Sequence, residues 1–181
     1  IFLRKNFVAT ERTSELAYKK TPLRGWLRKI IIKKSSLIIS NSKFGKEYLT
    51  KNGISNNRIK LVRNIIFPLK KLNPKKEDNN KGNFILCVGR IEENKGVYTS
   101  LNAMCKISYN IKLKFIGEGK DKGNLLQIIK RKGMGNRISI VDYDENWVLN
   151  NKSALGLLSM SCYEGSPNVV LEAMNAEIPT I

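Results

Sequence analysis

Two glutamates near the end of the chain, Glu164 and Glu172, stand eight positions apart in the stretch SCYEGSPNVVLEAM. Ser166 is a good helix N-cap and Pro167 a good first helical residue, so a helix is predicted to begin near Pro167. Glu164 then lies in the loop before the helix, and Glu172 lies about a turn and a half inside it. Such a pair of carboxylates can accept hydrogen bonds from the hydroxyls of a sugar and a ribose.

The start of the same predicted helix offers backbone amides. The N–H groups around Gly165–Val169 have few partners inside the helix, and the helix dipole favours an anion at this end. Gly165 leaves the space that a ligand touching the backbone requires. The alternative is that both glutamates only complement the dipole, but that effect fades within the first turn and Glu172 lies deeper. A sugar and a ribose joined by a diphosphate would match this arrangement.

A second stretch, VGRIEENKG, combines two cations with a predicted helix start. Arg90 directly follows Gly89, the last residue of a predicted strand, and Lys95 comes just before the next helix. Two cations beside a helix N-terminus suit a diphosphate, because the dipole and the free N–H groups favour the anion while the side chains neutralise it. The same cations could instead pair with Glu92 and Glu93 on the surface, and the spacing alone leaves both interpretations open.

The familiar nucleotide-binding motifs do not fit a third stretch, GEGKDKG, which begins at Gly117. It has three residues where the dinucleotide fingerprint has two, and it lacks the Ser or Thr that a P-loop places after its lysine. Its glycines are typical of a tight strand-to-helix turn, with close approach of a ligand as the second interpretation.

The elements that position these residues alternate regularly after residue 83. The predicted strands are 84–89, 111–117, 137–143 and 154–160, and the predicted helices are 96–107, 122–133, 145–152 and 167–176. Strand and helix alternating with short loops predict a doubly wound parallel sheet. Because ligands bind beyond the carboxyl ends of the strands in such sheets, the site is expected at 89–96, 117–119 and 161–167.

The front of the chain carries most of the positive charge. Residues 1–76 hold 20 Lys and Arg against 3 Asp and Glu, a balance of +17, whereas residues 77–181 hold 13 against 12, a balance of +1. This asymmetry indicates one basic face on one module, which could dock on an anionic membrane. A compositional bias toward solvated lysines is the alternative.

The predicted helix PLRGWLRKIIIKK gathers apolar side chains on one side, namely Leu23, Trp26, Leu27 and Ile30. This stripe could pack on its own domain or touch an anionic membrane surface. Strands at 6–12, 36–40 and 58–64 and a helix at 42–53 complete the front segment. The pattern fails over 65–83, which holds two prolines and a polar run and is predicted to be a linker.

Composition limits the classes that remain. No apolar run is long enough for a membrane span, no signal peptide is recognisable, and both ends look cut, so the chain is expected to be a fragment. Three cysteines, Cys87, Cys105 and Cys162, form no C-x-x-C pair, which argues against a disulfide framework or a zinc site and fits a reducing compartment. The sequence has no His, so the usual general base and metal ligand are missing.

Taken together, VGRIEENKG, FIGEG and EGSPNVVLEAMNAEIPTI resemble the donor-binding domain of retaining glycosyltransferases of family 4, which have the two-domain GT-B fold. Residues 84–181 match that domain in order and spacing. FVATERTSEL and SLIISNSKFGKEYLTKNGISNNRIKLVRN are similar, more weakly, to the end of the family's acceptor domain. The resemblance implies residues 1–64 as the acceptor-domain part, 65–83 as the linker and 84–181 as an incomplete donor domain.

The resemblance also implies roles. Arg90 and Lys95 would hold the diphosphate and stabilise the leaving nucleoside diphosphate in place of a metal, and Glu164 would bind the donor sugar near the reacting carbon. Glu172 would bind the ribose hydroxyls, and the segment Val141–Asp144 would meet the base, chiefly through its backbone. The full set expected to bind the donor is Gly89, Gly117, Val141, Asp142, Gly165, Ser166, Pro167, Asn168 and Glu172. Fixed donors facing a developing charge would make the catalysis electrostatic.

Two departures from the family's pattern stand out. GSP replaces the usual GF or GFP after the first glutamate, which leaves the donor preference open, and Glu177 stands where a glycine usually makes the turn. Part of the family's active site is also missing from this sequence, so the truncated chain is expected to be inactive by itself.

The main interpretation is therefore a GT-B glycosyltransferase fragment whose full protein transfers a hexosyl group, with retention, from a nucleoside-diphosphate sugar. UDP- and GDP-sugars are the expected donors, with no metal and no tightly bound cofactor, and a glycan or lipid-linked hydroxyl is the expected acceptor. Its expected place is the cytoplasm, with a peripheral position at the inner face of the membrane as an option. The alternatives are a basic nucleic-acid-binding module, against which the few aromatics argue, and a catalytically inactive sugar-nucleotide-fold protein.

Overall fold

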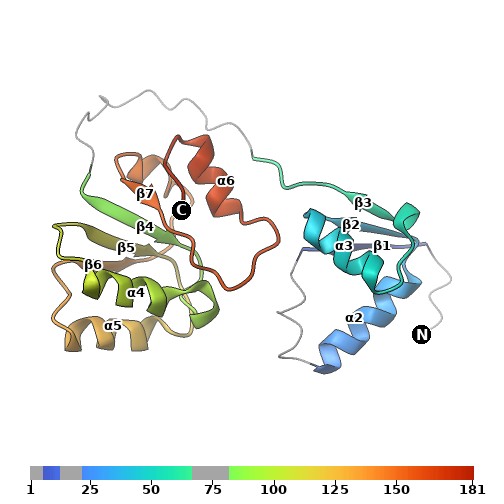
Figure 1. Cartoon of the computed structure of the whole chain (residues 1–181), viewed down its shortest axis with the longest axis horizontal. Helices are drawn as coiled ribbons and strands as arrows, with labels where there is room; N and C mark the ends of the chain where they lie inside the picture. The colour runs from blue at the N-terminus through green and yellow to red at the C-terminus, as the bar shows by residue number, and fades with distance from the viewer. Residues whose placement is uncertain (1–5, 13–21, 67–81) are drawn as a thin grey trace. The chain divides into compact units, whose positions relative to one another are not determined.

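The computed structural model describes residues 6–12, 22–66 and 82–181, so most of the predicted linker, 67–81, lies outside the described residues (Figure 1). The chain divides into two compact units. The first unit comprises residues 1–65 together with 163–167, and the second comprises 66–162 together with 168–181. Within the described residues, no helix combines the length and the apolar character needed to cross a membrane.

The first unit is a three-stranded parallel sheet with two described helices (Figure 1). Its elements are β1 (Val8–Glu11), α2 (Pro22–Lys34), β2 (Leu37–Ser40), α3 (Lys43–Lys51) and β3 (Ile59–Leu61), with the strands in the order β1-β2-β3. Aliphatic side chains form its core, namely Ile32, Ile38, Leu49, Ile54 and Ile59. The Ser42 hydroxyl caps α3 by accepting a hydrogen bond from the Gly45 N–H at 3.1 Å.

The apolar stripe predicted for helix α2 does not face the sheet. A different side of the helix does. Ile32 is buried, and Arg28 forms an ion pair with Glu11, whose side chain is 1% exposed. Burial lowers the pKa of Arg28, while the Tyr48 hydroxyl, which it also meets, works in the opposite direction. The members of the predicted stripe instead face solvent, with Leu23 69%, Trp26 59% and Leu27 46% exposed and Ile30 half-buried.

The second unit is a four-stranded, wholly parallel sheet in the order β6-β5-β4-β7. The strands are β4 (Phe84–Val88), β5 (Lys112–Ile116), β6 (Ile138–Val141) and β7 (Gly156–Leu157), and the helices are α4 (Val97–Lys106), α5 (Lys122–Arg131) and α6 (Asn168–Asn175). Figure 1 shows α4 and α5 on one face of the sheet and α6 on the other. The predicted α/β class with a parallel, doubly wound sheet is confirmed.

Each face of this sheet has its own core. One core joins Phe115 and Leu113 of β5 to apolar side chains of α4 and α5. The other joins Leu86, Ile116 and Leu157 to Trp147 and to residues of α6 and the C-terminal turn. Cys87 of β4 packs at the edge of the first core, where burial raises the pKa of its thiol to about 11 and a hydrogen bond to Ser100 opposes the shift.

The predicted helix at 145–152 is wrong in type. The chain there forms turns followed by a 3₁₀ turn at Leu149–Asn151. Polar side chains hold these turns, because Asp144 accepts hydrogen bonds from the Asn146 N–H and the Asn150 amide, and Asn151 donates to the Trp147 carbonyl. Strand β7 is shorter than predicted, with only Gly156–Leu157 paired to β4.

The turn after α6 contains Glu177, the one described non-glycine residue with positive φ, at 61°. It closes the helix through its N–H, which donates to the Met174 carbonyl at 3.1 Å, and the Ile178 N–H then donates to Ala173 at 3.0 Å. A side chain in this left-handed region costs free energy that a glycine does not pay. The substitution noticed in the sequence therefore stands at a position whose backbone favours glycine.

We expect Glu177→Gly to stabilise the protein, because removing Cβ relieves a strain of about 1–2 kcal/mol, partly offset by the greater freedom of glycine in the unfolded chain. Thermal or urea unfolding of the variant would show a higher midpoint. A Glu177→Ala variant, which keeps Cβ, serves as the control and should show no such gain. A lower midpoint for Glu177→Gly would contradict the argument.

Candidate functional site

The loops at the carboxyl ends of the second unit's strands are bound to one another through their main chains. The Gly117 N–H, after β5, donates to the Val141 carbonyl of β6 at 2.9 Å. The Ile91 N–H, after β4, donates to the Glu118 carbonyl at 2.8 Å, and the Cys162 N–H donates to the Asn94 carbonyl at 2.9 Å. The structure thus brings together the strand-end segments that follow β4, β5 and β7.

Glycines make this close approach possible. A Cβ added to Gly117 would stand 1.9 Å from the Gly89 carbonyl oxygen, and one added to Gly96 would stand 2.2 Å from the carbonyl oxygen of Met160. The backbone of all three glycines has positive φ, at 149°, 142° and 71° for Gly117, Gly89 and Gly96. Space and conformation therefore both require glycine at positions 96 and 117, whereas at position 89, which has open space around it, only the conformation does.

Arg90 lies on the surface of this edge. Its side chain is 64% exposed, and its guanidinium donates to Glu92 at 3.2 Å, as the ion-pair interpretation predicted. An exposed ion pair of this kind contributes little to stability, so Arg90 can exchange Glu92 for a phosphate at small cost. The structure therefore shows the ion pair between Arg90 and Glu92, and this exposed pair is compatible with binding of a diphosphate by Arg90.

Lys95 ends the 3₁₀ turn Glu93–Lys95, immediately before Gly96 and α4. Its N–H donates to the Glu92 carbonyl at 2.9 Å, and the Glu93 N–H is held at 2.7 Å by the Asp121 carboxylate. Two separate bonds thus fix the turn that carries Lys95 at the N-terminus of α4, as the sequence predicted from its spacing.

Glu172 is positioned by a residue that the sequence analysis did not select. The Trp147 indole N–H donates to a Glu172 carboxylate oxygen at 3.0 Å, and the indole itself is 1% exposed in the core below α6. Glu172 also lies close to the loop after β6, because its charge raises the pKa of Tyr143, although burial is the larger cause. The hydrogen bond from Trp147 thus holds one oxygen of the Glu172 carboxylate in place.

Val141 and Asp142, at the end of β6, are both exposed. The Lys122 ammonium of α5 donates to Asp142 at 2.5 Å and to Glu118 at 2.8 Å. These bonds raise the pKa of Lys122, and the bond from Lys122 is the chief reason that the pKa of Asp142 is lowered. The Asp142 side chain is therefore engaged with Lys122, which leaves the backbone of this strand end as its ligand-facing part.

The segment Tyr163–Pro167, which contains Glu164, belongs to the first unit. The Asn64 amide donates to the Ser166 carbonyl at 2.8 Å. A Cβ on Gly165 would lie 3.0 Å from the Arg12 carbonyl oxygen and 3.1 Å from the Asn41 amide oxygen, so this glycine permits a close approach. Asn41, 7% exposed, and Asn64 are residues that the sequence analysis missed, although both stand at strand ends.

The predicted site residues therefore fall into two sets. Gly89, Arg90, Lys95, Gly117, Val141 and Asp142 occupy the carboxyl edge of the second unit's sheet, with Asn168 and Glu172 on α6 of the same unit. Glu164, Gly165, Ser166 and Pro167 occupy the segment that belongs to the first unit. Within the second unit, the arrangement offers backbone amides, two cations and one anchored carboxylate.

Comparison with known proteins identifies relatives for both units. The chain is 28% identical over 169 residues to the N-acetylgalactosamine-N,N'-diacetylbacillosaminyl-diphospho-undecaprenol 4-alpha-N-acetylgalactosaminyltransferase of Campylobacter jejuni, covering 90% of this chain and 46% of that one. It is 27% identical over 97 residues to an uncharacterised glycosyltransferase of Methanocaldococcus jannaschii, covering 52% of this chain and 24% of that one. The chain thus spans about half, or less, of the length of these relatives.

Solved structures show the same architecture. The lipopolysaccharide outer core galactosyltransferase WaaB is 25% identical, with a TM-score of 0.66 over 82% of this chain and 43% of that one. HepE of Anabaena, solved with UDP-glucose, is 19% identical, with a TM-score of 0.80 over 98% of this chain and 53% of that one. These neighbours are GT-B glycosyltransferases, and the expected fold is confirmed.

The family profile described as Glycosyl transferases group 1 matches residues 70–181, which include the whole described part of the second unit's sheet. This match favours the glycosyltransferase interpretation over a nucleic-acid-binding module. The chain belongs to the glycosyl transferases group 1 family.

Proposed function

We propose that this chain is the donor-binding part of a retaining, family 4-type glycosyltransferase that transfers a hexosyl group from a nucleoside-diphosphate sugar. The acceptor is a hydroxyl of a glycan or of a lipid-linked saccharide. The observation that carries the proposal is the joined strand-end edge, which carries two cations at the start of α4, in the same unit as a carboxylate on α6 anchored by Trp147. The uridine nucleotide of the HepE structure and the diphospho-undecaprenol in the Campylobacter relative's name support this donor and acceptor class.

Each part of the edge has a chemical task in this proposal. Arg90 and Lys95 neutralise the diphosphate, and the N-terminus of α4 adds the dipole that favours an anion. As the sugar–phosphate bond breaks, negative charge develops on the departing nucleoside diphosphate, and these preorganised donors stabilise it without a metal. The open space beside Gly89, where an added Cβ would meet nothing within 4 Å, allows the phosphate to approach the main chain.

Recognition of the nucleoside and of the sugar falls to other groups. Glu172, with one oxygen held by Trp147, presents its other oxygen to the ribose hydroxyls. The backbone at Val141 and Asp142 meets the base, since the Asp142 side chain is engaged with Lys122. Glu164 hydrogen-bonds the donor sugar beside the reacting carbon, and the backbone of 165–168 touches sugar and phosphate.

We expect Glu172→Ala in the full-length protein to weaken binding of uridine diphosphate about tenfold or more, because charge-assisted hydrogen bonding to the ribose is lost. Isothermal calorimetry would measure the affinity, with guanosine diphosphate compared in parallel. Glu47→Ala, which removes an exposed glutamate of α3, is the matched control and should leave the affinity unchanged. Equal affinity in Glu172→Ala and wild type would refute the assignment of Glu172 to the ribose.

Trp147→Phe should reveal the positioning role of the indole N–H. Phe keeps most of the buried ring but cannot donate to Glu172, so uridine diphosphate should bind several-fold more weakly. A 2′,3′-dideoxyuridine diphosphate lacks the hydroxyls that Glu172 would bind, and its affinity should be the same for variant and wild type. If both ligands weaken equally, the indole contributes only packing.

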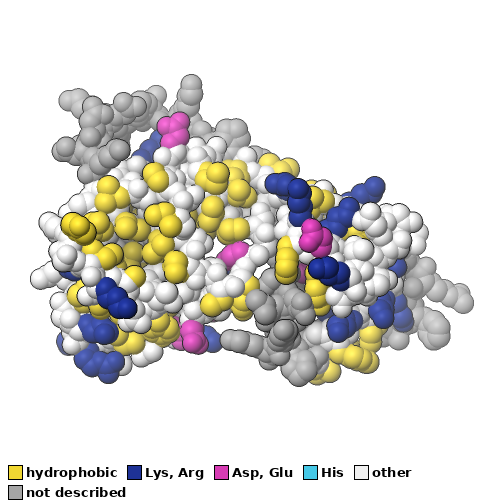
Figure 2. Space-filling model, in the orientation of Figure 1, with side chains coloured by type: hydrophobic (Ala, Val, Ile, Leu, Met, Phe, Trp, Pro, Cys, Tyr) yellow, Lys and Arg dark blue, Asp and Glu magenta, His cyan; other side chains and the backbone are white. Residues whose placement is uncertain are grey.

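We also propose that the protein works in the cytoplasm, peripherally at the inner face of the membrane, through the basic first unit. The balance of +17 over residues 1–76 and the free thiols of all three cysteines support this location. Lys and Arg side chains are visible on the face of the first unit shown in Figure 2, with few acidic side chains among them.

Sedimentation with lipid vesicles tests the membrane proposal. The full-length protein should pellet with vesicles that contain phosphatidylglycerol at low salt and should stay in the supernatant with phosphatidylcholine alone. Absence of pelleting with the anionic vesicles would remove this part of the proposal and leave the donor site untouched.

A further inference from the structure

The segment 163–167 carries Glu164 and has no regular secondary structure. The Glu164 residue is exposed, whereas Gly165 and Ser166, which follow it, are half-buried. An irregular segment has many backbone conformations open to it, and selecting one of them costs conformational entropy. A carboxylate that binds a substrate from such a segment therefore needs neighbouring residues that are held by contacts of their own.

Two asparagines of the first unit hold the carbonyl of Ser166. The side-chain amide of Asn64, which follows β3, donates to this carbonyl at 2.8 Å, and the side-chain amide of Asn41, which follows β2, donates to the Asn64 amide oxygen at 3.4 Å. The backbone N–H of Asn41 donates in turn to the Glu11 carbonyl of β1 at 3.2 Å. Ser166 is thus linked to residues at the carboxyl ends of β1, β2 and β3.

The Ser166 carbonyl determines the direction of these hydrogen bonds. A carbonyl oxygen can only accept, so Asn64 turns its amide nitrogen toward Ser166 and its amide oxygen toward Asn41. Asn41 then presents its own nitrogen to Asn64, and its buried amide oxygen has no hydrogen-bond partner within the described residues. Because a buried acceptor without a donor costs free energy, this arrangement serves the segment at the expense of Asn41.

Gly165 packs closely against the same strand ends. A Cβ added there would lie 3.0 Å from the Arg12 carbonyl oxygen and 3.1 Å from the Asn41 amide oxygen, so one of the neighbours would have to shift. Its φ is not among the positive values, so the close approach alone, and not the backbone conformation, favours glycine at this position.

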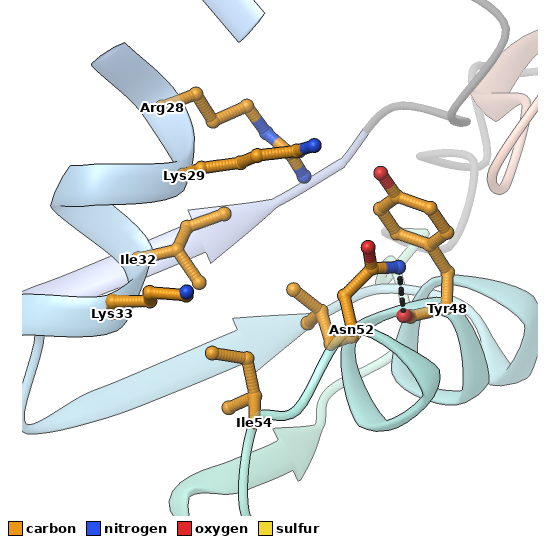
Figure 3. A pocket seen from close by; sticks show the side chains of 8 residues that line it. Arg28, Lys29, Ile32, Lys33, Tyr48, Asn52 and Ile54 are labelled. Atoms are coloured by element: carbon orange, nitrogen blue, oxygen red, sulfur yellow. Dashed lines mark hydrogen bonds between the residues drawn. The ribbon is translucent and has the colours of Figure 1, made fainter. Parts of the chain in front are cut away.

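An ion pair fixes the strand end that Gly165 contacts. Glu11, the residue before Arg12, is 1% exposed and pairs with Arg28 of α2. Figure 3 shows Arg28 extending from α2 at a cavity of about 130 Å³ between α2 and α3, with Tyr48 of α3 across it. Breaking such a pair would leave a buried charge uncompensated. The end of β1 is therefore a firm support for the segment.

We infer that Asn41 and Asn64 are positioning residues for Glu164: they hold the segment 163–167 so that this carboxylate has a fixed place beside the donor sugar. The inference rests on the role proposed for Glu164 above and adds the residues that hold it. Nucleotide recognition, by contrast, is assigned to Glu172 and the strand-end edge of the second unit. Binding of the sugar can therefore be weakened without weakening binding of the nucleotide.

Asn64→Asp in the full-length protein tests the hydrogen bond to Ser166. Aspartate has the shape of asparagine but offers an oxygen in place of the donating nitrogen, so it repels the Ser166 carbonyl. Calorimetry with UDP-glucose, UDP-N-acetylgalactosamine and GDP-mannose should show about fivefold or greater loss of affinity for the sugar nucleotide that wild type binds best. The affinity for the matching nucleoside diphosphate should stay the same. Asn57→Asp, with the same change of charge at an exposed position of the first unit, is the control and should bind both ligands normally.

Gly165→Ala tests the close approach of the backbone. The added methyl group must displace the segment from Arg12 and Asn41, so the sugar nucleotide should lose more affinity than the nucleoside diphosphate does. Gly135→Ala adds the same group at an exposed glycine where a Cβ would meet nothing within 4 Å, and it should bind as wild type does.

A double-mutant cycle separates positioning from a general loss of structure. If Asn64 acts through Glu164, then Asn64→Asp should weaken sugar-nucleotide binding in wild type but add little in a Glu164→Ala background. Amide hydrogen exchange in the segment 163–167 should also be faster in Asn64→Asp and in Gly165→Ala than in wild type. Thermal unfolding of each variant checks that the fold is retained.

The possible results distinguish this inference from the proposed function. Unchanged affinity for the sugar nucleotide in Asn64→Asp and Gly165→Ala would overturn the inference alone, and so would an equal loss for both ligands or additive effects in the cycle. Wild type that binds a nucleoside diphosphate but none of the three sugar nucleotides would overturn the role of Glu164 as well. If wild type binds no nucleotide at all, the proposed function fails, and hydrogen exchange still decides whether Asn64 holds the segment.

Discussion

Main-chain contact between neighbouring strand ends is the constraint on which the second unit's site depends. Gly117 lies so close to the Gly89 carbonyl that no side chain fits between the strands, and the loops that follow exchange hydrogen bonds directly. The turn that carries Lys95, the start of α4 and the end of β6 are therefore held in fixed relation. The backbone positions from which the Arg90 and Lys95 side chains extend are fixed in the same way.

In the first unit, an ion pair determines which side of a helix faces the sheet. Arg28, whose side chain is 15% exposed, forms an ion pair with Glu11 at the end of β1, and this pair holds α2 with its apolar stripe facing outward. A buried ion pair is a weak source of stability but a strong determinant of orientation, because breaking it would leave an uncompensated charge. The same contact therefore anchors the helix and leaves Leu23, Trp26 and Leu27 on its exposed side.

Much of the fold follows from the sequence. Continuous apolar runs such as FILCV and helices closed by glycine place β4 to β6 and α3 to α5 within a few residues. Hydrophobic periodicity does not predict features of the fold that depend on contacts between residues far apart in the sequence. It cannot tell which stripe of α2 faces the sheet, because the answer depends on Glu11, which is 17 residues before Arg28. It also predicts a helix at 145–152, where side-chain bonds from Asp144 and Asn151 hold turns instead.

The candidate site, too, could be predicted from the sequence only in part. The types and spacing of Arg90, Lys95 and Glu172 point to a donor site, and the glycines mark the turns. The support of Glu172 by Trp147 could not be foreseen, because the two residues are 25 positions apart and meet only when α6 packs over the turns after β6. The sequence did not single out Asn41 and Asn64 either, because asparagine is common in loops of every kind.

The thiol in β4 sets a limit on how this protein responds to oxidants. With its pKa raised to about 11, Cys87 holds its proton at any pH that a cell maintains, and a protonated thiol is a poor nucleophile. Peroxide and alkylating agents therefore react first at Cys105 and Cys162, which are exposed. Mild chemical damage would accumulate at the surface while the strand that ends at Gly89 stays unmodified.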